Sequence, residues 1–478
     1  MYKWIALASG FCLMAFELVA ARLLAPTIGS STFIWTNVIG VIMGAMALGY
    51  MWGGKLADKR KSETDIIYLC LATAISITAV LVFHTPVIDF AREFSTDTRW
   101  QGLFAAIFLF APTSVIVGML SPYLAKLALI NNTTKTGEVV AKLSTFNAIG
   151  SIAGTFITGF VLFGVIGSRS TLAIAAVIML VASWLIAPSL KLWHKVIASV
   201  MLLLAILLSI APVEADAISI DTATGNYRIT KDQYYGRPVT YLWAGPGGIQ
   251  SGSYNTGDKD LVFWYTKEIA DVVHMFSADT TPERMLILGG GAFSLPEYFG
   301  RLYPDAIVDV VEIDPDLETI AREHFRFEKP DNVTIYTEDA RSYVNRIDDI
   351  TYDVIVVDVF SDDSVPWQFL TRQFGDKVAS LLSEQGIVIV NTFSAPTPEC
   401  ADISDAGIAV YSRHLPVVYS KFNNPESRKI TNREIVFSRN AISVPEGYET
   451  TDTANLHVYS DDFAPIDQLR QQCVNSVE

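Results

Sequence analysis

Seven apolar stretches in the first 212 residues constrain the fold of this 478-residue chain more than any other feature. Each is long enough to cross a bilayer as a helix, which takes about 20 residues. Short polar links join them, which argues against buried helices of a soluble core. We therefore expect residues 1–212 to form a seven-span α-helical membrane domain embedded in the lipid bilayer, with spans at about 4–27, 33–54, 66–84, 102–125, 143–167, 170–188 and 195–212.

The distribution of charge divides the chain at the same place. Residues 1–212 carry a net charge of +6, whereas residues 213–478 carry a net charge of −21. The acidic half lacks the basic surface that nucleic-acid phosphates require, so we expect no nucleic-acid partner. An acidic surface suits small cations, although it also serves plain solubility.

The Lys and Arg residues of the short loops predict the orientation in the membrane. The N-terminus and the loops after the second, fourth and sixth segments hold ten of them, and the opposite loops hold three. This pattern predicts a multi-pass protein of the cell (inner) membrane with a cytoplasmic N-terminus, and seven spans would then place the polar half outside the cytoplasm. Because nucleoside cofactors are made inside the cell, the alternative is that one segment does not span.

Two ionisable residues of the first segment, Glu17 and Arg22, lie at membrane depth. Charges there are costly and usually face a partner or a cavity. We interpret them as a polar pair that stabilises the helix bundle, and a polar pocket for a cationic ligand is the alternative. Small residues at close-packing spacing also predict tight contacts between helices, at Gly150 and Gly154 and at Gly40, Gly44 and Gly49.

The polar half changes pattern twice. In residues 213–265, apolar and polar residues alternate and Gly and Pro mark turns, which predicts a small β-hairpin region. A helical stretch follows, and from residue 285 strands and helices alternate, which predicts a Rossmann-like α/β domain over residues 266–478. The predicted strands are near-continuous apolar runs, typical of a parallel sheet covered on both faces; they cover 285–289, 307–313, 333–338, 352–360 and 386–393. Residues 400–478 read as further strand and loop.

Three consecutive glycines, Gly289, Gly290 and Gly291, close the first of these strands and open a helix. Glycine permits positive φ and lets a ligand approach the backbone closely. A dinucleotide-binding loop needs a further glycine where this chain has Ser294. We therefore favour a ligand without a pyrophosphate, of the S-adenosylmethionine type.

Polar residues follow the next strands at the edge where such sheets bind their ligands. Glu312 ends the second strand, where a carboxylate can accept both ribose hydroxyls. Asp339 and Ala340 follow the third strand, where a side chain and a backbone N–H can contact an adenine edge. Asp358 ends the fourth strand. Each alone is typical of a turn or a helix cap, but together they predict a nucleoside site.

These motifs resemble the spermidine synthase-like aminopropyltransferases over about residues 220–395, and the whole chain resembles the membrane-fused members of that family in bacteria. The resemblance rests on GGG, VVEIDP (310–315), EDA (338–340) and YDVIVVD (352–358), with GRPVTYL, IQS (249–251) and Tyr265 upstream. It implies a class I methyltransferase-like fold and transfer of an aminopropyl group from decarboxylated S-adenosylmethionine to a diamine such as putrescine, releasing methylthioadenosine.

The resemblance also implies residue roles. Asp358 matches the position of the catalytic base, and Gln250 and Tyr265 match positions that line the donor and amine pocket. No metal is implied, and the four cysteines and six scattered histidines of the chain predict no metal site.

The chain departs from the family pattern at three anchors for amine groups. Ala292 replaces the acid after the third glycine, Lys267 replaces the acid of the Tyr265 motif, and the second acid after Asp358 is displaced, so that Asp362 or Asp363 would substitute. Two alternatives therefore stay open: an enzyme that consumes intact S-adenosylmethionine, as methyltransferase or lyase, and a polyamine or nucleoside transporter with a binding domain. A homo-oligomer is compatible with each alternative.

Overall fold

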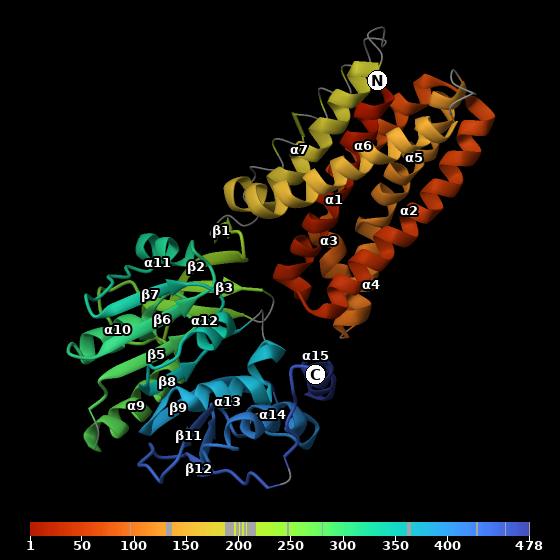
Figure 1. Cartoon of the computed structure of the whole chain (residues 1–478). Helices are drawn as coiled ribbons and strands as arrows, with labels where there is room; N and C mark the ends of the chain where they lie inside the picture. The colour runs from red at the N-terminus through yellow and green to blue at the C-terminus, as the bar shows by residue number, and fades with distance from the viewer. Residues whose placement is uncertain are drawn as a thin grey trace. The chain divides into compact units, whose positions relative to one another are not determined.

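The computed structural model of the chain describes residues 1–95, 97–130, 136–186, 217–245, 248–279, 281–360, 365–426, 429–454 and 456–477, with isolated positions between 196 and 207. The chain forms two compact units (Figure 1). A helical unit comprises residues 1–215 and 219–226, and an α/β unit comprises residues 216–218 and 227–478.

The helical unit contains long apolar helices at six of the seven predicted spans. Among the described residues, five helical runs are long and apolar enough to cross a membrane, and the last of them is the 49-residue run Thr136–Trp184. Gly167 breaks this run with φ 76° and ψ 175°, between the two predicted spans. The seventh predicted span, 195–212, lies outside the described residues apart from isolated positions. The helices are α1 (Tyr2–Ile28), α2 (Thr32–Arg60), α3 (Glu63–Phe94), α4 (Thr98–Leu109), α5 (Ala111–Ile130), α6 (Thr136–Ile157) and α7 (Phe163–Ile186).

Glycines let two helix pairs, α1 with α6 and α2 with α5, approach closely. A Cβ atom at Gly150 would lie 2.0 Å from the carbonyl oxygen of Leu7 on α1. Gly154 and Gly49 similarly meet backbone atoms of α1 and α5, so the predicted close packing is confirmed at these three positions. Open space instead surrounds the other two glycines of the prediction, Gly40 and Gly44.

The predicted Glu17–Arg22 pair stays a prediction, and Arg22 also makes contacts elsewhere in the helical unit. The Arg22 guanidinium donates to the carbonyl oxygens of Ala223 and Gly225, at 3.2 and 3.4 Å, and lies 4.2 Å from the ring centre of Phe163. Residues five apart on a helix do not share a face, whereas residues three or four apart do. The spacing of Glu17 and Arg22 therefore does not by itself place the two side chains on one face of α1.

A four-stranded antiparallel sheet follows the helices, in the order β1-β2-β3-β4. A two-residue turn with φ of 48° at Tyr235 and 79° at Gly236 joins β2 to β3, as expected for a tight hairpin. This sheet corresponds to the β region predicted from the sequence; its strands are β1 (Ala217–Asp221), β2 (Asn226–Tyr234), β3 (Arg237–Ala244) and β4 (Ile249–Tyr254).

The α/β unit is built on an eight-stranded sheet in the order β12-β10-β11-β9-β8-β5-β6-β7. Strands β5 to β9 are parallel, and β11 lies antiparallel between β9 and β10. The predicted methyltransferase-like α/β domain is confirmed, and the five predicted strands correspond to β5–β9. The strands are β5 (Arg284–Leu288), β6 (Ile307–Glu312), β7 (Val333–Thr337), β8 (Tyr352–Val357), β9 (Leu382–Ser394), β10 (Val417–Phe422), β11 (Thr431–Ser438) and β12 (Glu449–Thr450).

Helices cover both faces of this sheet (Figure 1). Residues of α12, α13 and α14 share one apolar core with alternate residues of the central strands, such as Leu288, Val357, Val390 and Ile435. On the other face α9 contacts α10 and β11. The helices are α9 (Trp264–Asp279), α10 (Ser294–Leu302), α11 (Leu317–His324), α12 (Ala340–Arg346), α13 (Arg372–Ser380), α14 (Ala401–Tyr411) and α15 (Ile466–Val477).

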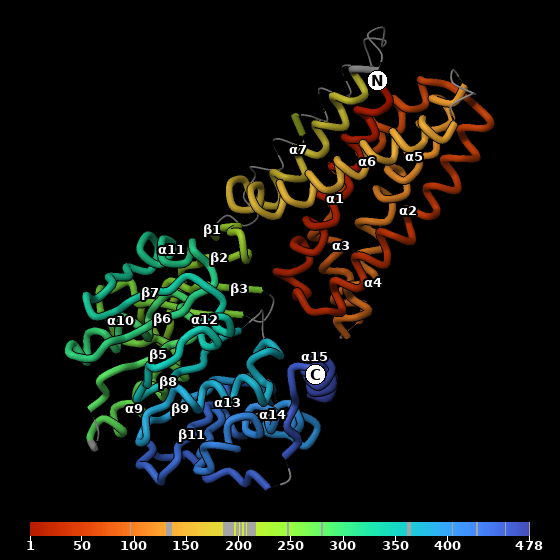
Figure 2. Tube along the Cα trace, viewed as in Figure 1, coloured from red at the N-terminus to blue at the C-terminus, as the bar shows by residue number. Residues whose placement is uncertain are grey.

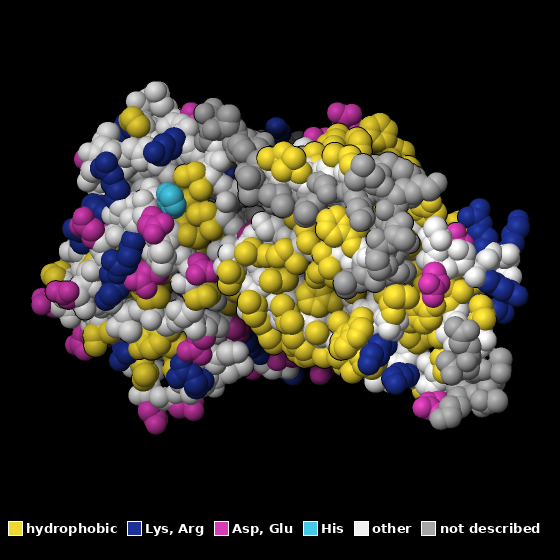
Figure 3. Space-filling model, turned by 90° about the horizontal axis from the view of Figure 1, so that it is seen from above, with side chains coloured by type: hydrophobic (Ala, Val, Ile, Leu, Met, Phe, Trp, Pro, Cys, Tyr) yellow, Lys and Arg dark blue, Asp and Glu magenta, His cyan; other side chains and the backbone are white. Residues whose placement is uncertain are grey.

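The surfaces of the two units differ in chemistry. Figure 3 shows a broad field of hydrophobic side chains over the helical unit, whereas charged side chains of both signs are scattered over the α/β unit. Monomeric soluble proteins rarely expose apolar patches of this extent. The exposed side chains of the helical unit include Met43, Phe83, Ile152, Phe156, Phe160 and Val165.

A disulfide bond closes the last part of the α/β unit. Cys400, just before α14, is bonded to Cys473 on α15, 73 residues later. Both cysteines are buried in a small cluster with Ala395, and α15 lies beside α14 (Figure 2). The other two cysteines of the chain, Cys12 and Cys70, are free and buried in the helical unit.

Candidate active site

The three glycines form the bend at the carboxyl end of β5. Gly289 has φ +100°, and a Cβ atom there would lie 2.1 Å from the carbonyl oxygen of Asp358. Gly291 also has positive φ, +54°. Glycine is required at this bend because any side chain would clash or adopt strained backbone angles, so the bend brings the β5 loop against the end of β8.

Glu312, the last residue of β6, holds the bend in shape. Its Oε2 accepts hydrogen bonds from the backbone N–H groups of Gly290 and Gly291, at 2.8 and 3.4 Å. Its Oε1 accepts from the N–H of Asp314 at 2.9 Å. Burial raises the pKa of Glu312, and these three N–H groups oppose that rise. Its predicted contact with ribose hydroxyls stays a prediction.

Asp339 and Ala340 start α12 at the end of β7. Asp339 Oδ1 accepts a hydrogen bond from the N–H of Ser342 at 2.8 Å, which makes Asp339 the cap of this helix. Ala340 is buried, with 6% of its surface exposed. The structure thus gives Asp339 a structural role, and its predicted adenine contact stays a prediction.

Asp358 follows β8 directly and lies against the glycine bend. Its Oδ1 accepts a hydrogen bond from Asn391 Nδ2 at 2.9 Å. The side chain keeps some exposed surface, yet enough protein surrounds it that burial raises its pKa to about 6, against the effect of Asn391. A carboxylate with a pKa of about 6 is ionised at neutral pH and can take up a proton during a reaction.

Tyr265 connects α9 to β4, the strand that holds Gln250. The Tyr265 hydroxyl donates to the backbone carbonyl of Gln250 at 3.2 Å. Burial raises the pKa of Tyr265 well above its ordinary value, and the negative charges of Asp358 and Glu434 raise it further. The side-chain Oε1 of Gln250 is buried without a hydrogen-bond partner in the described part of the chain. The predicted Asp362, and Asp363 beside it, lie outside the described residues.

Glu434 on β11 is a site residue that the sequence prediction missed. It pairs with Asn391 across β11 and β9, and its neighbour Ile435 belongs to the core under α12–α14. Because successive side chains of a strand point to opposite faces, Glu434 points to the face that α9 covers, as Asn391 and Asp358 do. The signal available in the sequence is a lone carboxylate beside the apolar run Ile435–Phe437.

A third acid, Glu268 on α9, faces the same region but has its own partner. The Lys421 ammonium on β10 lies 2.9 Å from each carboxylate oxygen of Glu268 and 3.0 Å from the carbonyl oxygen of Glu446. The Tyr448 ring lies 5.5 Å from the same ammonium. The hydroxyl of Tyr448 is buried without a hydrogen-bond partner among the described residues.

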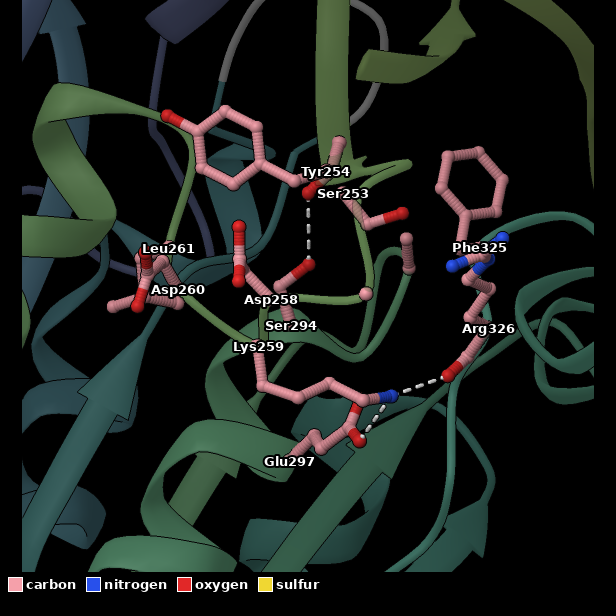
Figure 4. A pocket seen from close by; sticks show the side chains of 13 residues that line it. Ser253, Tyr254, Asp258, Lys259, Asp260, Leu261, Ser294, Glu297, Phe325 and Arg326 are labelled. Atoms are coloured by element: carbon pink, nitrogen blue, oxygen red, sulfur yellow. Dashed lines mark hydrogen bonds and ion pairs between the residues drawn. The ribbon is translucent and has the colours of Figure 1, made fainter. Parts of the chain in front are cut away.

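A separate hollow lies between the end of β4 and the start of α10 (Figure 4). Lys259 crosses it to Glu297 Oε1 at 2.8 Å and to the carbonyl oxygen of Arg326 at 2.6 Å. Ser294 Oγ donates to the carbonyl oxygen of Gly252 at 3.1 Å. These contacts fasten the small sheet onto the α/β sheet beside Ala292. The hollow includes neither Glu312 nor Asp358, so it lies apart from the predicted nucleoside site.

A comparison with known protein families agrees with this geometry. Residues 262–409 match the spermine/spermidine synthase domain. The spermidine synthase-like domain thus includes the glycine bend, Glu312, Asp339 and Asp358, and it ends before β10 and β11. The match identifies a domain of enzymes and leaves the reaction of this chain to be proposed.

Relatives of two kinds are similar to part of this chain. A polyamine aminopropyltransferase from Vibrio vulnificus (strain CMCP6) is 40% identical over 115 residues, which cover 24% of this chain and 38% of that protein. The eEF1A lysine and N-terminal methyltransferase of Homo sapiens is 28% identical over 182 residues, which cover 35% of this chain and 25% of that protein. The chain therefore spans well under half the length of either relative.

Solved structures of both kinds are also similar. A probable spermidine synthase from Corynebacterium glutamicum ATCC 13032 is 20% identical with a TM-score of 0.44, covering 53% of this chain and 99% of that chain. Human methyltransferase-like protein 13, solved in complex with SAH, is 24% identical with a TM-score of 0.30, covering 45% of this chain and 91% of that chain.

Proposed function

We propose that the chain transfers an aminopropyl group from decarboxylated S-adenosylmethionine to a diamine such as putrescine. The observation that carries this proposal is Asp358, a carboxylate with a pKa of about 6 next to the glycine bend. Its position in the matched domain and the similarity to the Vibrio vulnificus enzyme support the same reaction.

For this reaction the protein needs to position the two substrates and to provide one general base. The amine nitrogen forms a bond to the aminopropyl carbon of the sulfonium donor while the carbon–sulfur bond breaks. Methylthioadenosine leaves as a neutral thioether, and the nitrogen gives up one proton. Asp358 accepts that proton as general base, and the amide of Asn391 holds the carboxylate in place.

The donor's adenosine part would lie over the glycine bend. Gly290 and Gly291 let it approach the backbone. Glu312, already fixed by three backbone N–H groups, has remaining lone pairs for ribose hydroxyls. Asp339 and Ala340 would contact the adenine, and Tyr265 and Gln250 would line the reacting end.

The purified full-length chain tests this proposal directly. Incubation with decarboxylated S-adenosylmethionine should release methylthioadenosine only when a diamine is present. Asp358→Asn keeps the size of the side chain but removes the base, so turnover should fall at least a hundredfold, while methylthioadenosine binding measured by calorimetry stays within about twofold. Absence of product with every diamine would reject aminopropyl transfer.

A second candidate reaction is consumption of intact S-adenosylmethionine by a methyltransferase or a lyase. Ala292, which is 4% exposed, supports it, because the resemblance places an acid for the donor's amine at this position. The similarity to the human methyltransferase supports it as well. Chromatography of products from intact S-adenosylmethionine, alone and with amines, would distinguish the two candidates, and an untouched donor would reject the second.

We also propose that the α/β unit faces the outer side of the cell membrane. The Cys400–Cys473 disulfide supports this placement, because disulfides persist in oxidising compartments and are rare in the cytosol. The excess of Lys and Arg in the loops on the side of the N-terminus supports it independently. Protease added to intact spheroplasts should digest the α/β unit, and protection of that unit would reject the placement.

A further inference from the structure

Four side chains form a row across four neighbouring strands of the large sheet. Asn391 donates to Asp358, Glu434 pairs with Asn391, and Lys421 pairs with Glu434. Neighbouring strands lie about 5 Å apart, so the backbone positions of Asp358 and Glu434 are separated by about 10 Å. The row therefore presents two carboxylates on one face, with an amide between them.

Glu434 is buried without a partner. Its side chain is 0% exposed, and neither Oε1 nor Oε2 accepts a hydrogen bond from another residue in the described part of the chain. Burial, together with the charges of Glu268 and Asp358, raises its pKa well above the ordinary value. Buried charges are normally paired, so Glu434 would ionise here only when a cation binds beside it.

The described structure offers Glu434 no free cation. Lys421, directly opposite on β10, directs its ammonium to both oxygens of Glu268 and to the carbonyl oxygen of Glu446. An ammonium has three N–H donors, so these contacts account for its hydrogen-bonding capacity. The Glu268–Lys421 pair is neutral as a whole, so an ionised Glu434 beside Asp358 would lack a full countercharge among the described residues.

Aromatic hydroxyl groups complete the surroundings of the two acids. The charge of Glu434 acts on Tyr265 and on Tyr448. The Tyr448 hydroxyl is buried and has no hydrogen-bond partner within the described residues. Tyrosine rings attract ammonium groups electrostatically, and a hydroxyl oxygen can accept from them.

We propose that Glu434 binds the non-reacting ammonium of the acceptor amine, so that the substrate is a diamine or longer polyamine that extends from Asp358 to Glu434 along this row. The proposal rests on the proposed aminopropyl transfer. It assigns a specificity residue to β11, outside the segment that matches the family. It also explains how the site recognises a second charge on the acceptor although Lys267 replaces an acid of the family pattern. A monoamine of equal length would leave Glu434 unpaired.

Glu434→Gln, which keeps the shape and removes the charge, is the test variant. In the protein saturated with methylthioadenosine, the Kd for putrescine measured by calorimetry should rise about ten- to a hundredfold, as expected for a lost charged hydrogen bond. The Kd for butylamine, which has one charge, should change less than twofold. The Kd for methylthioadenosine should also stay the same.

Glu449→Gln is the matched control, because Glu449 is an exposed acid on the neighbouring strand β12. It removes the same charge from the same sheet and should leave every Kd unchanged. Glu268→Gln is an independent test. This variant frees the Lys421 ammonium to pair with Glu434, so the Kd for putrescine should rise here too.

Three results would overturn the assignment: putrescine affinity unchanged in Glu434→Gln, equal weakening of putrescine and butylamine, or weakened binding of the donor analogue alone. The binding assay needs no turnover, so it separates this inference from the reaction itself. Putrescine binding that depends on Glu434 without product would refute aminopropyl transfer only. Product formation at the same rate in Glu434→Gln as in the native protein would refute the assignment of Glu434 only.

Discussion

Loss of the Cys400–Cys473 disulfide should markedly destabilise the α/β unit. The bond closes a segment of 73 residues that includes α14, β10, β11 and β12. In the chain-entropy description, a loop of this length contributes up to about 4 kcal/mol to the free energy of unfolding. With a urea dependence of about 2–3 kcal/mol/M for a unit of this size, the unfolding midpoint should fall by about 1.5–2 M.

Pulse proteolysis of the detergent-solubilised full chain in increasing urea measures this midpoint for the α/β unit. The variant is Cys400→Ala with Cys473→Ala, and treatment of the native protein with dithiothreitol should give a similar shift. Cys12→Ala with Cys70→Ala, which removes the two free cysteines of the helical unit, is the matched control and should leave the midpoint unchanged. Equal midpoints for the oxidised and reduced protein, or two free thiols at Cys400 and Cys473 by mass spectrometry, would refute the reasoning.

Three further outcomes are expected. The kcat/KM for the diamine should fall as the pH drops below about 6, because protonation of Asp358 removes the base; a flat profile between pH 5 and 8 would contradict this role. Gly289→Ala should lower the free energy of unfolding of the α/β unit by about 1–3 kcal/mol from backbone strain alone, and it should displace Asp358. The control is Gly407→Ala, whose Cβ would make ordinary contacts, and it should be tolerated in the same urea assay. Gly150→Leu should separate α1 from α6 and lower the Tm of the helical unit, whereas Gly40→Leu, in open space, should not. A dye that labels the buried free cysteines of this unit on unfolding measures the Tm.

The parallel part of the sheet could be predicted from the sequence because its signals are local. Strands β5, β6 and β8 are largely apolar on both faces, and a glycine or a carboxylate stands where each of them ends. The positions of Gly289, Glu312 and Asp358 follow from that pattern alone, since parallel strands end at one edge. The structure brings these three residues together as predicted.

Features that depend on long-range pairing escaped prediction. The register of β11 against β9 places Glu434 opposite Asn391, 43 residues away in sequence, and no local motif marks that pairing. The disulfide likewise joins cysteines 73 residues apart, and cysteine count alone does not give connectivity. Asp339 shows that a local signal can also have two meanings. A carboxylate before a helix serves as a helix cap whether or not a ligand is bound.

The order of β9, β11 and β10 has an evolutionary consequence. Residues that would hold the nucleoside lie within 262–409, whereas Glu434 and Lys421 come from strands inserted beside β9 from later in the chain. Under the proposed transfer, mutations in that later stretch would change which nucleophile is accepted and leave the donor-binding residues unchanged. Proteins that share the earlier stretch could then differ in product while they bind the same sulfonium donor.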